Sequence, residues 1–327
     1  MVDTIQLADT GRRTTRLGFG GSSLMGSMDR RQSLRTLEWA FDAGIRHFDV
    51  APMYGYGEAE ACLGEFLSRH PGEVTVATKF GIPPAKHPGM IATARRFVAP
   101  LVKAIPGLKK RAQRVAKSVA GPREPRDLSP QKAAASLEKS LRDLRVERID
   151  LFLLHDATAE EVRDTALLEF LQTAKAAGKI AAFGVGTDPA HIDAIQEENL
   201  AYAQVIQCEW SVFDPTRSGT AFRIHHRSLG DNFRCLQQWL SASPLRMKEW
   251  SAAVNQDLAD GGVLSELMMR AALQMNPSGM LLFSSKNQKH IVENAAFATP
   301  SARDEAARKL YEKVQESADA IQSECVA

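Results

Sequence analysis

An α/β fold, in which eight parallel strands close into a (β/α)8 barrel, is predicted by three features of the sequence. The chain has 327 residues, a length that a single barrel domain reaches. Short apolar runs alternate with amphipathic stretches along most of the chain, which is the pattern of repeated βαβ units. About eight of the apolar runs are typical of strands, whereas a doubly wound open sheet, the alternative, usually has fewer.

The expected strands are short runs that are rich in apolar and β-branched residues. The β-branched run VTVATKFG and the apolar run RIDLFLLHD are the clearest of them. In chain order, the expected strands lie at 14–20, 45–50, 74–81, 148–156, 179–188, 201–210, 222–230 and 279–287.

The expected helices have apolar residues at helical spacing and recognisable ends. In the first of them, at 30–44, Leu37 and Phe41 fall on one face. Ser129 is expected to cap a later helix, which has Pro130 at its first position. The other expected helices lie at 58–70, 129–144, 160–178, 189–198 and 264–275.

Composition and charge are those of an ordinary globular protein. Hydrophobic residues make up 44% and charged residues 24% of the chain, and the net charge of +2 gives no indication of nucleic-acid binding. The N-terminal segment lacks the apolar centre of a signal peptide, and no run approaches the ~18 apolar residues that cross a membrane. The four cysteines lie far apart without a C-x-x-C pair. We therefore expect a cytoplasmic protein without a transmembrane segment, a disulfide scaffold or a bound metal.

Polar side chains interrupt the apolar strands at their carboxyl ends. Asp49, Lys79 and His155 lie at the ends of three successive expected strands, and Tyr54 follows five residues after Asp49. In (β/α)8 barrels, functional residues gather at the C-terminal ends of the strands. Each residue alone has a structural explanation, such as capping a turn, but the four together favour a catalytic site.

These four residue types can form a proton-donating unit. A tyrosine has an ordinary pKa of about 10, and the ammonium of Lys79 is expected to lower it. The buried lysine needs a counter-charge, which Asp49 can supply. His155 can hydrogen-bond a carbonyl oxygen and orient it. The set predicts Tyr54 as the general acid for an oxygen that becomes negative as hydride reaches its carbon.

Six segments of the chain, which occur in the same order as in the family, resemble the aldo-keto reductases. They are FDVAPMYGYGEAEACLG, VATKFG, RIDLFLLHD, KIAAFGVG, VIQCEW and LLFSSKNQKHIVENA. The resemblance extends from near residue 14 to near residue 298, and FDVAPMYGYG is most similar to bacterial sugar-dehydrogenase-like members. It implies a (β/α)8 barrel that uses NADPH, less often NADH. It also implies the catalytic residues Asp49, Tyr54, Lys79 and His155, with Tyr54 as the proton donor.

The resemblance implies nicotinamide contacts as well. Gln207 matches the glutamine that binds the nicotinamide amide, while His226 replaces the aromatic residue that usually stacks on the ring. Where the family usually has Ser-Asn, this chain has Gly186 and Thr187, and Thr187 can still donate a hydrogen bond.

The segment SSKNQKHIVEN matches the part of the family that holds the adenosine phosphates. Ser285, Lys286 and Asn294 fit that pattern, and His290 replaces a frequent arginine at the 2′-phosphate. Lys286 supplies one fixed charge, whereas bidentate arginine contact is missing. We therefore expect a modest preference for NADP(H) over NAD(H).

A long basic insertion follows the third expected strand, at 82–130, within a chain that we expect to form one domain over 1–327. It holds eleven Lys or Arg and two acidic residues, a net charge of +9, so the rest of the chain carries about −7. Short helices are expected in it from about Ile91 and over 108–120. Three explanations stay open: a lid with a solvated basic face, recognition of an anionic substrate or acidic partner protein, or contact with a membrane surface or nucleic acid.

The sequence thus predicts an NAD(P)(H)-dependent oxidoreductase that acts on a small carbonyl or sugar-like compound. It reduces an aldehyde or ketone, or oxidises the matching alcohol or hemiacetal. An alternative is a nicotinamide-binding barrel that acts as a sensor or regulatory subunit with little turnover. The sequence contains no G-x-S-x-G elbow and no H-E-x-x-H motif, which weighs against an α/β-hydrolase and a zinc protease.

Overall fold

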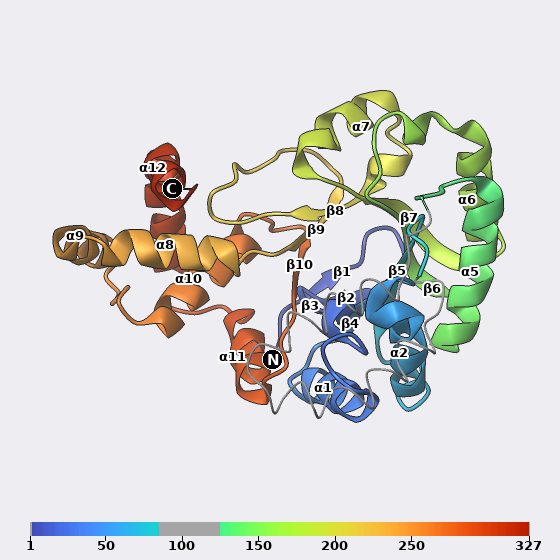
Figure 1. Ribbon diagram of the computed structural model, residues 1–327, viewed down its shortest axis with the longest axis horizontal. Helices are drawn as coiled ribbons and strands as arrows, with labels where there is room; N and C mark the ends of the chain where they lie inside the picture. Colours follow the sequence, from blue (N-terminus) through green and yellow to red (C-terminus); the bar gives the residue numbers. More distant parts are fainter. Residues whose placement is uncertain (1, 85–124, 327) are drawn as a thin grey trace, which may run out of the picture.

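The computed structural model describes residues 2–84 and 125–326, and within them eight parallel strands form a closed barrel surrounded by helices (Figure 1). Each strand pairs with the next, and the last closes the ring on the first through Leu281 opposite Leu17. The predicted (β/α)8 fold is confirmed. The barrel strands are β3 (Leu17–Gly20), β4 (His47–Asp49), β5 (Thr75–Phe80), β6 (Ile149–His155), β7 (Ile180–Gly186), β8 (Val205–Glu209), β9 (Phe222–His226) and β10 (Met280–Phe283).

Helices cover the outside of the barrel, and their ends follow local sequence signals. Asp29 caps the first helix by accepting a hydrogen bond from the backbone of Gln32, and Asp164 caps α6 in the same way. Ser129 and Pro130 begin α5 as predicted, although the Ser129 side chain makes no capping hydrogen bond. The surrounding helices are α1 (Arg30–Asp42), α2 (Ala59–Leu67), α5 (Pro130–Leu144), α6 (Thr165–Ala176), α7 (Ile192–Glu198) and α11 (Gln288–Phe297).

Four further helices lie together on one side of the barrel, at the left of Figure 1. They are α8 (Asp231–Ser241), α9 (Pro244–Val254), α10 (Gly261–Gln274) and the C-terminal α12 (Asp304–Val326). Of these, the sequence pattern predicted only α10. Cys235 on α8 is disulfide-bonded, which departs from the expectation of reduced cysteines, whereas Cys62 and Cys208 are buried free thiols. Among the described residues, no helix is long and apolar enough to span a membrane.

The barrel interior is filled from the strands and from an N-terminal hairpin. The hairpin pairs β1 (Thr4–Gln6) with β2 (Arg13–Thr15), and Leu7, which follows β1, is fully buried against the interior side chains. The run expected as a single strand at 14–20 is therefore divided between the hairpin and β3. The interior side chains are Ala77, Leu151, Leu153, Ala182, Val205, Phe222, Ile224, Met280 and Leu282.

Alternation along the strands sends neighbouring side chains to opposite faces of the barrel wall. On β4, Phe48 packs outward against Phe66 of α2, with ring centroids 4.9 Å apart, which leaves Asp49 facing inward. On β5, Thr78 donates a hydrogen bond to Glu60 of α2, at 2.7 Å, which leaves Lys79 facing inward. Two polar side chains therefore reach the same interior at the carboxyl ends of adjacent strands.

The insertion leaves and re-enters the barrel at one point. The backbone N–H of Asp127 donates to the carbonyl of Gly81, at 2.9 Å, so the two stems lie side by side. Gly81 has a φ of 111°, and a Cβ there would lie 2.5 Å from Cδ2 of Leu128, which requires glycine at this junction. The two helices expected in the insertion lie at 85–124, outside the described residues.

Replacing residues 85–124 with a short Gly-containing loop should give a folded protein that still binds the cofactor, with an altered range of substrates. The stems already meet, and loop closure changes by only ~0.6 kcal/mol per doubling of loop length. Thermal unfolding and a panel of charged and neutral carbonyl compounds check this. An unfolded variant would show that the insertion is part of the core. Unchanged activity on every compound of the panel would show that the insertion does not control substrate access.

Candidate active site

A buried ion pair lies at the carboxyl ends of β4 and β5. The Nζ of Lys79 donates to Oδ1 of Asp49 at 2.6 Å and approaches the carbonyl oxygen of Val50 at 3.3 Å. The second carboxylate oxygen of Asp49 accepts from Nε2 of Gln207, on β8, at 2.9 Å. The side chains of Lys79 and Asp49 are only 3% and 4% exposed, so the pair is desolvated and rigidly held.

Tyr54 lies beside this pair, in the loop that follows β4. Its backbone N–H donates to the carbonyl of Ala51, and it begins a short 3-10 turn, Tyr54–Gly57. Gly55 and Tyr56 in that turn both have left-handed backbones, with φ of 57° and 59°. A Cβ at Gly55 would lie 2.5 Å from the carbonyl oxygen of Leu24, so glycine lets the loop pack closely and fixes the tyrosine.

The rings of Tyr54 and His155 meet beside the lysine. The Nζ of Lys79 lies 5.5 Å from the centroid of the Tyr54 ring. The rings of Tyr54 and His155, the last residue of β6, meet edge to face, with centroids 6.3 Å apart and an interplanar angle of 86°. The structure therefore brings together Tyr54 and the three residues at the strand ends, Asp49, Lys79 and His155.

The pKa of Tyr54 is set by opposing effects. The positive charge of Lys79 has the largest effect and lowers it, but burial of the phenol and the negative charge of Asp49 raise it, so that the net pKa lies above the ordinary value of 10.0. Lys79 lowers the pKa of Tyr54 as expected, but the expectation of a lowered net pKa is wrong, because burial of the phenol and the charge of Asp49 together outweigh the lysine. Tyr54 is protonated at neutral pH, as a proton donor must be.

At neutral pH Lys79 is positively charged and His155 is neutral. Burial lowers the pKa of Lys79, but Asp49 and Tyr54 raise it and the net pKa lies above 10.5, so the ammonium persists. Burial and the charge of Lys79 lower the pKa of His155 to about 4, so its imidazole is neutral at pH 7. Its Nδ1 has no hydrogen-bond partner among the described residues. A neutral imidazole can donate one N–H to a carbonyl oxygen.

The expected nicotinamide residues lie on the neighbouring strands. Gln207 adjoins the ion pair, with Nε2 bonded to Asp49, and a Cβ at Gly186 would lie 3.7 Å from its Oε1. The hydroxyl of Thr187 donates a hydrogen bond to the carbonyl of Ala157, at 2.7 Å, so its proton is already engaged in a bond within the protein. His226 ends β9; burial and the charge of Lys79 lower its pKa to about 4.

A second group of expected cofactor residues lies in the loop after β10 and on α11. Lys286 and His290 are exposed, and His290 and Asn294 are one turn apart on α11. Asn287 caps this helix by accepting from the backbone N–H of Lys289, at 2.9 Å. A helix N-terminus beside a lysine suits a phosphate group. Ser285 shares hydrogen bonds with Asn287 and completes the turn.

These two groups fit the two ends of a nicotinamide dinucleotide. Gln207, the residue expected to bind the nicotinamide amide, adjoins the Lys79–Asp49 pair, and the residues expected at the phosphates lie at the N-terminus of α11. The loops that lead from β3 and β10 are linked through Ser23 and Ser284, whose hydroxyl oxygens lie 3.3 Å apart. Among the described residues, no group of three or more His, Cys, Asp or Glu side chains could hold a metal ion.

Two charged residues near His155 were not singled out from the sequence. Asp156, which follows it, has a left-handed backbone with φ of 58°, and its charge raises the pKa of His155. Arg126, at the end of the insertion, lowers that pKa and is paired with Glu161 at 2.5 Å. Arg126 is 29 residues before His155 in the chain, so only the folded insertion stem reveals their proximity.

Comparison with known proteins finds relatives that are named as dehydrogenases and reductases. The chain is 32% identical over 221 residues to pyridoxal 4-dehydrogenase of Microbacterium luteolum, over 59% of this chain and 58% of that protein. It is 31% identical over 196 residues to D-threo-aldose 1-dehydrogenase of Pseudomonas sp, over 56% and 54%. The chain thus covers somewhat more than half the length of these two relatives. It is 26% identical over 266 residues to an NADH-specific methylglyoxal reductase of Escherichia coli, over 79% and 70%.

Solved structures share the fold. A glycerol dehydrogenase from Gluconobacter oxydans superposes with a TM-score of 0.66 at 20% identity, covering 96% of this chain and 95% of that one. An aldo-keto reductase from Klebsiella pneumoniae in complex with NADPH gives 0.58 at 18% identity, with 92% of each chain covered. The model of the aldo/keto reductase family matches residues 16–228, which include Asp49, Tyr54, Lys79 and His155. This chain therefore belongs to the aldo/keto reductase family.

Proposed function

We propose that this protein is an NADP(H)-dependent oxidoreductase that reduces an aldehyde or ketone, or oxidises the matching alcohol or hemiacetal, with Tyr54 as the general acid or base. The observation that carries this proposal is the cluster around Lys79. Its ammonium is held 2.6 Å from Asp49 and 5.5 Å from the Tyr54 ring, whose other neighbour is the neutral His155.

Each residue of the cluster has a separate task in this reaction. The bound reduced nicotinamide supplies the hydride. His155 donates an N–H to the carbonyl oxygen and orients it, and Tyr54 gives its phenolic proton to that oxygen as negative charge develops. Lys79 stabilises the resulting phenolate, and Asp49 holds Lys79 in place and charged. In the direction of oxidation, the same phenolate takes the proton from the alcohol.

The substrate that we propose is a small carbonyl or sugar-like compound. The relatives are named for pyridoxal, an aldose and methylglyoxal, all of which contain a carbonyl group or form one. The net charge of +9 in the insertion favours anionic members of this class, or an acidic partner protein. We also propose that the chain forms a single domain, since the stems of the insertion meet at the barrel wall.

Turnover of a panel of aldehydes, ketones and sugars with NADPH and with NADH tests the proposal. We expect substrate-dependent oxidation of the reduced nicotinamide by at least one member of the panel. The alternative, a sensor or regulatory barrel, predicts cofactor binding without turnover of any of them. The buried and intact Lys79–Asp49 pair beside Tyr54 favours turnover.

We predict that NADPH binds more tightly than NADH, by roughly ten- to a hundred-fold, and that Lys286→Ala removes most of this difference. A hydrogen bond to a charged group contributes about 1.5–3 kcal/mol. Lys286 is the fixed positive charge among the residues that we expect to hold the 2′-phosphate. Dissociation constants from fluorescence quenching check this, with Lys289→Ala as the control, because Lys289 pairs with Glu293 on the same helix. Equal affinity of the wild type for both cofactors would place the 2′-phosphate elsewhere.

A further inference from the structure

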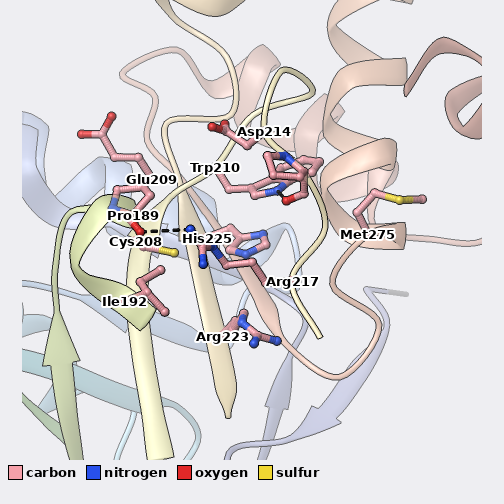
Figure 2. A pocket seen from close by; sticks show the side chains of 11 residues that line it. Pro189, Ile192, Cys208, Glu209, Trp210, Asp214, Arg217, Arg223, His225 and Met275 are labelled. Atoms are coloured by element: carbon pink, nitrogen blue, oxygen red, sulfur yellow. Dashed lines mark hydrogen bonds between the residues drawn. The ribbon is translucent and has the colours of Figure 1, made fainter. Parts of the chain in front are cut away.

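A cavity of about 40 Å³ lies in the outer wall of the barrel (Figure 2), and none of Asp49, Tyr54, Lys79 and His155 lines it. It opens where β8 and β9 are joined by residues 210–221, which form no helix in this structure, although a (β/α)8 barrel normally covers each strand with one. Val205 and Ile224 face the barrel interior, so the alternate residues Cys208, Arg223 and His225 face outward, into the cavity.

Arg223 is a buried guanidinium without a carboxylate partner among the described residues. It is 8% exposed, its Nη2 donates to the carbonyl of Ser218 at 2.5 Å, and its Nε has no hydrogen-bond partner. A Cβ at Gly219, where φ is +118°, would lie 3.2 Å from Nη2, so the loop closes tightly over the side chain. A buried positive charge with an unbonded N–H is expensive unless an acceptor meets it.

His225 presents a second unbonded polar atom to the same cavity. It is 4% exposed, and its Nδ1 has no partner in the described part of the chain. Its ring stacks on Trp210, with centroids 5.3 Å apart and an interplanar angle of 7°, which fixes its orientation. His225 and Arg223 are two residues apart on one face of β9, a separation of roughly 6.6 Å along the strand. Figure 2 shows the two side chains on the same side of the strand.

The acidic residues near the cavity already have partners. Asp214 accepts from the backbone and the hydroxyl of Ser211, at 2.7 and 2.9 Å. Glu209 pairs with Arg227, and Asp193 pairs with Arg217. None of these pairs includes Arg223, which forms no ion pair with any described carboxylate. The cavity exceeds the ~10–15 Å³ that one water needs, and it can take a group with several oxygen atoms.

We propose that this cavity binds a small oxyanion, the phosphate or carboxylate group of a metabolite, through Arg223 and His225. The acceptor oxygens would meet the guanidinium of Arg223 and an N–H of His225, with Trp210 as one wall. The site is independent of the catalytic cluster, yet Cys208 and His225 directly follow and precede Gln207 and His226 on β8 and β9. A bound anion would therefore hold the two strands that carry the expected nicotinamide contacts.

Titration with inorganic phosphate, sulfate and acetate, against chloride at equal ionic strength, tests this proposal by calorimetry and tryptophan fluorescence. We expect saturable anion binding at this cavity, seen as a tryptophan fluorescence change that Trp210→Phe abolishes. Arg223→Met should weaken binding by roughly ten-fold or more, as expected for a lost charged hydrogen bond. Tighter binding of phosphate would identify a phosphate group as the ligand, and tighter binding of acetate a carboxylate.

Two control variants separate this site from others, and a third variant provides a second test. Arg234→Met removes an exposed arginine of α8 that pairs with Asp231, and it should bind the anion as the wild type does. The Trp210 fluorescence change should also persist in Lys286→Ala, which separates it from anion binding at α11. If Arg223→Met does not fold, His225→Phe keeps the stacking on Trp210, removes Nδ1 and should weaken binding. The proposal is wrong if no anion binds more tightly than chloride, or if the Arg223 and His225 variants bind as the wild type does.

Discussion

Tyr54→Phe should lower kcat for carbonyl reduction by roughly 10²–10⁴-fold while leaving the affinity for NADPH unchanged. General acid catalysis typically contributes a factor of this size, and the substitution removes only the phenolic hydroxyl. The ring of Tyr54 stays between Lys79 and His155, so the packing of the cluster is retained. Steady-state rates and cofactor titration measure the two effects separately.

The matched control is Tyr311→Phe on α12. The Tyr311 hydroxyl donates to the carbonyl of Asp214, at 3.2 Å, outside the cluster, so its loss should leave kcat unchanged. Near-normal turnover by Tyr54→Phe would show that another group donates the proton. A weaker affinity for NADPH at normal kcat would assign Tyr54 to binding alone.

Lys79→Met should lower both the rate and the stability of the protein. It leaves the carboxylate of Asp49 buried with Gln207 as its remaining partner, and breaking a buried ion pair in this way typically costs about 3–5 kcal/mol. The pH profile should change as well. Lys79 lowers the pKa of Tyr54, so the pKa should rise when the lysine is removed. The pH above which the rate of carbonyl reduction falls should therefore also rise.

The double variant Asp49→Asn/Lys79→Met distinguishes the structural part of this loss from the chemical part. It removes both charges, so much of the stability should return, as measured by denaturant unfolding. The rate should stay low, because the phenolate of Tyr54 still has no ammonium beside it. Recovery of the rate together with the stability would show that Lys79 acts only as a structural partner of Asp49.

The fold and the residues of the cluster could be predicted because both leave local signals in the sequence. Each barrel strand is a short apolar run, and Asp49, Lys79 and His155 interrupt those runs at the ends that meet at one edge of a parallel barrel. The ion pair between Lys79 and Asp49 followed from the same placement, since a buried ammonium needs a counter-charge.

The features that could not be predicted depend on the sum of several distant contacts. The net pKa of Tyr54 combines burial with two opposite charges, and their balance needs distances. The hydroxyl of Thr187 is bonded to Ala157, 30 residues away in the chain. The helices α8, α9 and α12 pack mainly on one another and on α10. The cavity beside β8 and β9 lies where the connection between these strands forms no helix.

Transfer of deuterium tests the central claim most directly. NADPH in which both hydrogens of the hydride-donating carbon are replaced by deuterium is mixed with the wild-type protein and a carbonyl compound that it turns over. The product alcohol is then examined by mass spectrometry. The account predicts one deuterium on the former carbonyl carbon, at a rate that Tyr54→Phe lowers by roughly 10²–10⁴-fold. A product without deuterium, or transfer at equal rates in both proteins, would contradict it.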